Sequence, residues 1–113
     1  MEKKFELTEE TQIAINGVAL HRIRALRDFN DVKKGDLGGW VKKEENLSHE
    51  GNCWIYDNAT VGNDALVSDN ARIYDMALVV NNARMYHNSQ MRGHACMCDN
   101  AQMHDNAQMS GNS

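Results

Sequence analysis

The stretch Ile55–Ala77 reads IYDNATVGNDALVSDNARIYDMA and repeats a unit of six residues. In each unit a large apolar residue is followed, four positions later, by a small one. The large residues are Ile55, Val61, Val67, Ile73, Val79, Met85, Met91, Met97, Met103 and Met109. The small residues are Ala59, Ala65, Ala71, Ala77, Ala83, Ser89, Ala95, Ala101, Ala107 and Ser113. The register holds to the end of the chain without an insertion, so it predicts a fold of stacked units.

Alternation along a strand explains the unit, because it turns the large apolar residue into a core and its two neighbours outward. The small residue also faces inward, where the chain bends. Asp, Asn and Gly lie between these positions, and they tolerate the left-handed backbone of a tight corner. A period of six resembles the hexapeptide repeats of left-handed β-helices, in which three units form one triangular coil. We therefore predict an all-β fold, a left-handed parallel β-helix of about three coils.

Residues 1–50 have a different pattern, which predicts a β-hairpin. Asn16-Gly17 is a strong two-residue turn signal. Short strands are expected at residues 4–7 and 12–15, with a return strand at 18–26. A loop-rich segment then leads to Leu47 and Cys53, where the first coil begins. The hairpin would cap the open N-terminal end of the helix, where unpaired backbone invites other chains. The expected division is 1–50 for the cap with its connecting loops and 51–113 for the β-helix.

Eighteen residues per coil would place residues eighteen apart above one another, and this produces one apolar outer face. It contains Leu78 and Cys96 beside Val80 and Cys98, with Met76 at the preceding corner. Such a face indicates an interface, here between copies of the chain in a dimer or trimer. The alternative is that these are scattered surface residues, which are normal.

A second outer face combines aromatic and Arg side chains: Trp54, Tyr56, Arg72, Tyr74 and Arg92. This composition is typical of binding hot spots. Stacked Tyr residues also stabilise neighbouring strands without binding anything. Both interpretations remain open from the sequence.

One corner stacks Asp69, His87 and Asp105. A His between two carboxylates suits a proton relay or a weak metal site, or the column simply hydrogen-bonds to itself. The run His94-Ala95-Cys96-Met97-Cys98 also contains metal ligands. Alternation places the two Cys on one flat face and His94 beyond a bend, whereas a closed zinc site needs four converging ligands. We therefore predict no metal site and no cofactor.

Charge and composition limit the function. The net charge is −4, which does not indicate a protein held to nucleic acid by phosphate contacts. Residues 51–113 contain three Arg and six Asp, so the repeat half is mildly acidic. Three Cys without a disulfide spacing fit a reducing cytosol, and no apolar run is long enough to span a bilayer. The expectation is a cytoplasmic protein without a membrane partner.

Four segments carry a family resemblance: Asp28–Val32, Gly38–Trp40, Asn46–Ser48 and Glu50–Asp57, which reads EGNCWIYD. Together they resemble the YdcK-type hexapeptide-repeat proteins of bacteria and their phages, over nearly the whole chain. The length resembles the short, phage-borne version. Proteins of this type are usually called acyltransferases, a label drawn mainly from the fold, and fold alone is weak support for an activity.

Acyltransferases of this fold carry a catalytic His, bind the acyl carrier between subunits, and have a loop extruded from the coils. The ten units here contain no extruded loop, and no His has a positioned partner in the sequence. We therefore predict no catalytic residue and a non-catalytic inhibitor of phage or prophage type. Its rigid acidic surface would block a host protein such as a defence nuclease, as anti-CRISPR proteins do. The alternatives are an acyl-CoA-dependent acyltransferase and a purely structural oligomeriser.

Overall fold

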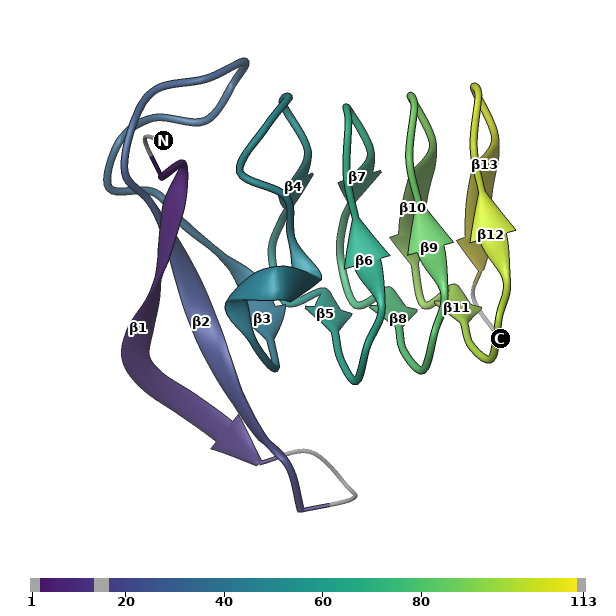
Figure 1. Ribbon diagram of the computed structural model, residues 1–113, viewed down its shortest axis with the longest axis horizontal. Coiled ribbons are helices and arrows are strands. Elements are labelled where there is room, and N and C mark those ends of the chain that lie inside the picture. The colour runs from purple at the N-terminus through teal and green to yellow at the C-terminus, as the bar shows by residue number, and fades with distance from the viewer. Residues whose placement is uncertain (1–2, 14–16, 112–113) are drawn as a thin grey trace.

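A computed structural model describes residues 3–13 and 17–111 and shows a parallel β-helix with a hairpin at its N-terminal end (Figure 1). The N-terminal part contains β1 (Phe5–Ile13), β2 (Ala19–Ala25), β3 (Leu37–Val41) and a 3-10 helix, η1 (Glu44–Asn46). The coils contain β4 (Trp54–Ile55), β5 (Thr60–Val61), β6 (Leu66–Val67), β7 (Arg72–Ile73), β8 (Leu78–Val79), β9 (Arg84–Met85), β10 (Gln90–Gly93), β11 (Cys96–Met97), β12 (Gln102–Met103) and β13 (Gln108–Gly111). The predicted all-β class is confirmed.

Three parallel sheets form the walls of the helix, in the orders β3-β5-β8-β11, β4-β7-β10-β13 and β6-β9-β12. From β4 to β10 each strand pairs with the strand eighteen residues later, as in Thr60 with Leu78. Four strands in one wall make about four turns, rather than the predicted three. The prediction counted from Ile55, whereas β3 already forms part of a coil by pairing Trp40 with Thr60. A bridge between Leu47 and Val67 completes this early coil.

The core follows the predicted register. The large apolar residue of every unit from Ile55 to Met103 is buried, and Met109 is half-buried. The small residues from Ala59 to Ala95 are buried too, whereas Ala101 and Ala107 are exposed in the last coil. Ser113 lies outside the described residues. Burial therefore declines toward the C-terminal end of the stack.

The corners use the left-handed backbone that the Asp and Asn residues predict. Eight corner residues have φ between 52° and 62°: Asp57, Asn63, Asp69, Asp75, Asn81, His87, Asp99 and Asp105. At three of these positions, Asp57, Asp69 and Asp75, the Asp side chain accepts a hydrogen bond from the backbone amide eighteen residues later. Asp69 Oδ2 accepts from the His87 amide at 3.0 Å, and Asp75 Oδ2 accepts from the Gly93 amide at 2.9 Å. The corners thus link consecutive coils through side chains as well as backbone.

The predicted hairpin is present, but it joins the β-helix by strand pairing instead of lying over the open end as a separate cap. β1 is one strand with an irregularity between Leu7 and Thr11, rather than two short strands. Asn16 lies outside the described residues, and Gly17 has φ 84°. β2 pairs antiparallel with β3, and β3 pairs parallel with β5. The hairpin therefore extends one wall of the helix as additional strands.

β3 lies in the segment that was predicted to be loop-rich, and that prediction was wrong. Its two glycines let the strand lie directly against the first coil. A Cβ on Gly38 would stand 2.6 Å from the Ile55 carbonyl oxygen, which is too close for any other residue. Gly-Gly is common in turns and loops, so nothing in the sequence indicated a strand here.

Buried side chains join the hairpin to the coils. Phe5 and Ile23 belong to the same hydrophobic cluster as Ile55. Lys4 is fully buried, and its Nζ donates to the Cys53 carbonyl oxygen at 2.7 Å, 3.2 Å from Cys53 Sγ. Burial lowers the pKa of Lys4 and raises the pKa of the Cys53 thiol.

Candidate functional site

The outer face of β5, β8 and β11 carries the predicted apolar strip. Leu78 pairs in register with both Thr60 and Cys96, so the expected stacking is present. Met76 is 54% exposed at the preceding corner. Cys96 and Cys98 are exposed free thiols farther along the same face. The structure therefore brings together all five residues of the predicted interface.

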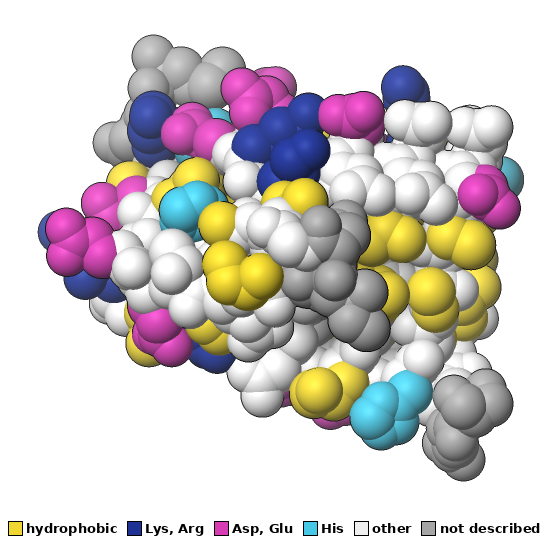
Figure 2. Space-filling view, turned by 90° about the horizontal axis from the view of Figure 1, so that it is seen from below, with side chains coloured by type: hydrophobic (Ala, Val, Ile, Leu, Met, Phe, Trp, Pro, Cys, Tyr) yellow, Lys and Arg dark blue, Asp and Glu magenta, His cyan; other side chains and the backbone are white. Residues whose placement is uncertain are grey.

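The hairpin turns this face into a groove of about 690 Å³. Its lining is Gln12, Ile13, Val18, Leu20, Thr60, Gly62, Asn63, Met76, Leu78 and Val80. We call this the apolar groove. None of these ten described residues is charged. Figure 2 shows hydrophobic side chains gathered over the stack on this side, next to the hairpin.

Sequence reasoning missed the hairpin's share of the apolar groove. Ile13 is 66% exposed and Val18 and Leu20 lie on the neighbouring strand segment. Ile13 ends a strand that also contains Phe5 and Leu7, so the sequence pattern did not mark it as a groove residue. Its position beside Leu78 depends on the pairing of β2 with β3, which the sequence did not reveal.

The second predicted face forms a stack of aromatic rings. The Tyr56 and Tyr74 rings lie parallel with centroids 4.6 Å apart, and the Arg92 guanidinium lies 5.4 Å from the centre of Tyr74. Tyr56 donates its hydroxyl to Asp31 Oδ1 at 2.7 Å. Burial and then this bond to Asp31 raise the pKa of Tyr56. Arg72 is half-buried on β7, two residues before Tyr74 in the same coil.

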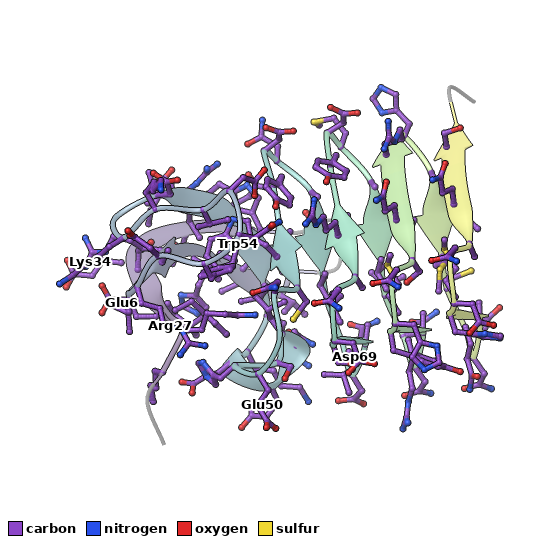
Figure 3. The ribbon with its side chains drawn as sticks, turned by 90° about the horizontal axis from the view of Figure 1, so that it is seen from above. Glu6, Arg27, Lys34, Glu50, Trp54 and Asp69 are labelled. Atoms are coloured by element: carbon purple, nitrogen blue, oxygen red, sulfur yellow. The ribbon has the colours of Figure 1, made fainter. Side chains whose placement is uncertain are left out.

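Trp54 does not belong to this outer surface, which corrects the prediction. It is 2% exposed and packs edge-on against Phe29, with ring centroids 5.3 Å apart. Figure 3 shows Trp54 among the side chains between the N-terminal segments and the coils. The segment around Phe29 covers the first layer of the face, and no sequence periodicity indicated that.

The predicted column of Asp69, His87 and Asp105 is present at one corner, where Figure 3 labels Asp69 at the outer edge of the coils. His87 donates its amide to Asp69, and the Asp105 amide donates to His87 Nδ1 at 3.1 Å. Because Nδ1 accepts there, the neutral ring carries its proton on Nε2. A shallow groove of about 520 Å³ runs along the column, with Asn70, Asn88 and Asn106 beside it.

His104 joins this corner, and the sequence reasoning missed it. Its Nδ1 lies 3.0 Å from Asp105 Oδ2, and its ring stacks on Tyr86 with centroids 5.4 Å apart. The hydrogen bond with His104 lowers the pKa of Asp105, and His87 contributes in the same direction. The eighteen-residue register places His104 above Tyr86, and this is the signal that could have found it.

Comparisons with known proteins show a similarity to a bacterial protein. No family model matches the chain. The chain is similar to a protein of Escherichia coli (strain K12) named "Uncharacterized acetyltransferase YdcK", with 42% identity over 74 residues. The match covers 58% of this chain and 23% of the relative, so the chain spans about a quarter of the relative's length.

The similarity to this relative and the stacked parallel sheets are both consistent with a hexapeptide-repeat protein. This confirms the resemblance in its broad form, whereas the short phage-borne version stays a prediction. Among the described residues, no helix has the length and apolar character needed to cross a bilayer.

Proposed function

We propose that this chain is a non-catalytic protein-binding module whose apolar groove receives a second copy of the chain. The groove itself is the observation that supports the proposal. The large hydrophobic side chains exposed among the described residues are Ile13, Leu37 and Met76, and two of them line the groove. Exposed apolar surface gathered in a concave site is typical of protein interfaces.

Charge permits a second copy as the occupant of the groove. Each chain carries a net charge of −4, so two copies repel one another over most of their surfaces. The uncharged groove is a region where two copies make contact without burying like charges. It also offers both halves of a reciprocal contact, because Ile13 protrudes while Leu78 and Val80 form the floor. A twofold axis would place the Ile13 of each copy against the floor of the other.

Light scattering of the purified chain tests this assembly. We expect a mass of twice 12.8 kDa for the wild type and the monomer mass for Leu78→Asp. Leu66→Asp is the matched control, because Leu66 is also the outward-facing, partly buried first residue of a two-residue strand, on another wall. A wild-type monomer at all concentrations, or equal dissociation by Leu66→Asp, would overturn the second-copy interface.

The inhibition of a host protein is a narrower proposal that uses the acidic half of the chain. It is supported by the excess of Asp over Arg in residues 51–113 and by the rows of corner side chains, such as Asn63 and Asp64. Cleavage by a purified RNA-guided nuclease should fall when the chain is added. Unchanged cleavage at saturating chain concentration would contradict this target.

Acyl transfer is the second candidate, and the name of the Escherichia coli relative favours it. The relative's activity is a proposal for this chain, which covers only 23% of that protein. His87 and His104 beside Asp105 are the groups available for proton transfer. Saturable binding of acetyl-CoA, with turnover that is lost in His104→Gln, would replace the binding-module proposal with an enzyme.

A further inference from the structure

Three side chains from two successive coils converge at the corner that follows β9 and β12. His87 Nδ1 lies 3.2 Å from Asp105 Oδ1, and His104 Nδ1 lies 3.0 Å from Asp105 Oδ2. One ligand atom from each of the three residues falls within 4.8 Å of the others. Among the described residues, no other three His, Cys, Asp or Glu side chains meet in this way.

Two of these three separations match those between ligands of a metal ion. Zinc binds nitrogen and oxygen at about 2.0–2.1 Å, so neighbouring ligand atoms of a tetrahedral site lie about 3.3 Å apart. The two His–Asp distances are already close to this value. On binding, His87 Nδ1 would exchange the hydrogen bond that it accepts from the Asp105 amide for the ion. Two imidazoles and one carboxylate form a donor set that zinc and similar divalent transition metals accept.

Neighbouring contacts hold the three ligands in place. The His104 ring lies 19° from parallel to Tyr86, and the Tyr86 hydroxyl donates to Gln102 at 3.2 Å. The backbone of His87 is fixed by its hydrogen bond to Asp69, one coil earlier. Partners of this kind orient metal ligands and raise affinity. All three ligands are exposed, so an ion reaches them from solvent without any movement of the coils.

We propose that His87, His104 and Asp105 bind one divalent transition-metal ion of the zinc type, with water in the remaining positions. The sequence had predicted no metal site, because the corner column offered only His87 between two carboxylates and the ligands of the His94–Cys98 run did not converge. His104 adds a second imidazole, and this gives the corner the donor set that zinc accepts. The site joins the coil of His87 to the coil of Asp105, and it stands independently of the apolar groove.

Calorimetric titration with Zn²⁺ tests the site, together with the visible spectrum of Co²⁺. Both are carried out in a Cys96→Ser, Cys98→Ser background, because exposed thiols compete for zinc. We expect one equivalent bound per chain. His104→Gln should weaken zinc binding by at least about 10- to 100-fold. Loss of a residue that merely supports a metal ligand already costs this much, and His104 is itself a ligand. His87→Asn should do the same while keeping the left-handed corner, which Asn adopts at position 81.

His94→Gln is the control, because His94 is an exposed histidine outside the cluster. It should leave the affinity unchanged. Paramagnetic Co²⁺ should broaden the ring resonances of His87 and His104 and leave those of His94 sharp. The proposal is overturned if no saturable binding occurs. It is equally overturned if His94→Gln weakens binding as much as His104→Gln, since the ion would then be adventitious.

Discussion

Gly39 lies where the backbone of β3 passes closest to the first coil. A Cβ at this position would stand 2.5 Å from Ile55 Cγ2 and closer still to the Ala59 carbonyl oxygen. Real side chains do not approach backbone so closely, and a carbonyl in a coil has little freedom to move. The glycine therefore determines how tightly the N-terminal strands lie against the β-helix.

Replacing Gly39 by Ala should destabilise the protein by about 1–3 kcal/mol, the range for overpacking a core. Gly62→Ala is the matched control, because a Cβ there would meet only Val80 Cγ1 at an ordinary 3.6 Å. That variant should stay within about 1 kcal/mol of the wild type. Urea unfolding measures both, and equal losses would show that close approach is not what position 39 requires.

Glu44 is held by a chain of hydrogen bonds that begins in the hairpin. The Lys4 amide donates to His49 Nδ1 at 3.1 Å, so Nε2 carries the proton and donates to Glu44 at 2.8 Å. This bond, with a smaller contribution from Lys3, lowers the pKa of Glu44 below its usual 4.5. The ionised carboxylate is therefore the form that the folded state prefers.

Because folding lowers the pKa of Glu44, this carboxylate stabilises the folded protein only at pH values where it is ionised. The contribution of Glu44 is fully present above pH 4.5 and is lost as the pH falls through the folded pKa, because the unfolded chain binds the proton more readily. Glu44→Gln should reduce the loss of stability in this acid range. Glu45→Gln, at the exposed neighbouring position, serves as the control. The urea midpoint, measured across acid pH, tests this. An equal fall of the midpoint in the wild type and in Glu44→Gln would contradict the prediction.

At the scale of the element, the corner is the unit that links coils. The corner residues Asp57, Asp69 and Asp75 each accept an amide hydrogen bond from the corner eighteen residues later, as Asp69 does from His87. The same residue adopts a φ of 58°, which costs most side chains about 1–2 kcal/mol and Asn or Asp much less. One side chain therefore serves both the turn and the stacking.

Asp69→Ala removes the acceptor and places a less tolerant residue at the left-handed position. We expect a loss of about 1–2 kcal/mol in the free energy of unfolding. Asp69→Asn retains an acceptor oxygen and the conformational tolerance, so it should fall within about 0.5 kcal/mol of the wild type. Thermal unfolding of the two variants distinguishes them, and an Asn variant as unstable as the Ala variant would indicate that charge is what matters.

The repeat predicted these elements well, because every six-residue unit encodes its own core residue and corner. It could not predict where non-repeating segments attach. The strand at Gly38–Trp40 was read as loop, and Trp54 was assigned to a surface that Phe29 covers. Ile13 at the apolar groove was missed for the same reason, since long-range pairing of β2 with β3 leaves no local pattern. His104, in contrast, was within reach of the register.

The whole molecule is a stack in which burial is greatest near the hairpin and declines toward β13. Ala77 and Val79 are fully buried, whereas Ala101 and Ala107 are exposed and Met109 is only half-buried. The core residues also change from Ile and Val to Met, which is more flexible and specifies packing less tightly. Local opening should therefore be easiest in the final coil.

Val79→Asp tests whether the stack unfolds as one body. Val79 is completely buried in the middle of the coils, and an unpaired carboxylate there costs several kcal/mol. We expect loss of the cooperative unfolding transition in circular dichroism. Arg84→Ala, at an exposed position one unit later, should change the free energy of unfolding by no more than about 0.5 kcal/mol. A folded Val79→Asp variant would mean that the coils tolerate local breaks.

The left-handed corners also restrict how such a chain changes length. Deleting one six-residue unit would leave a regular repeat, yet it would rotate every later unit by one wall. Leu78 would then leave the side that faces the hairpin, and the hydrogen-bonded columns of Asp residues would no longer coincide. Removing eighteen residues together would preserve every wall and every column. Viable length variants of this protein should therefore differ by whole coils, so that the stack grows or shortens in steps of eighteen residues.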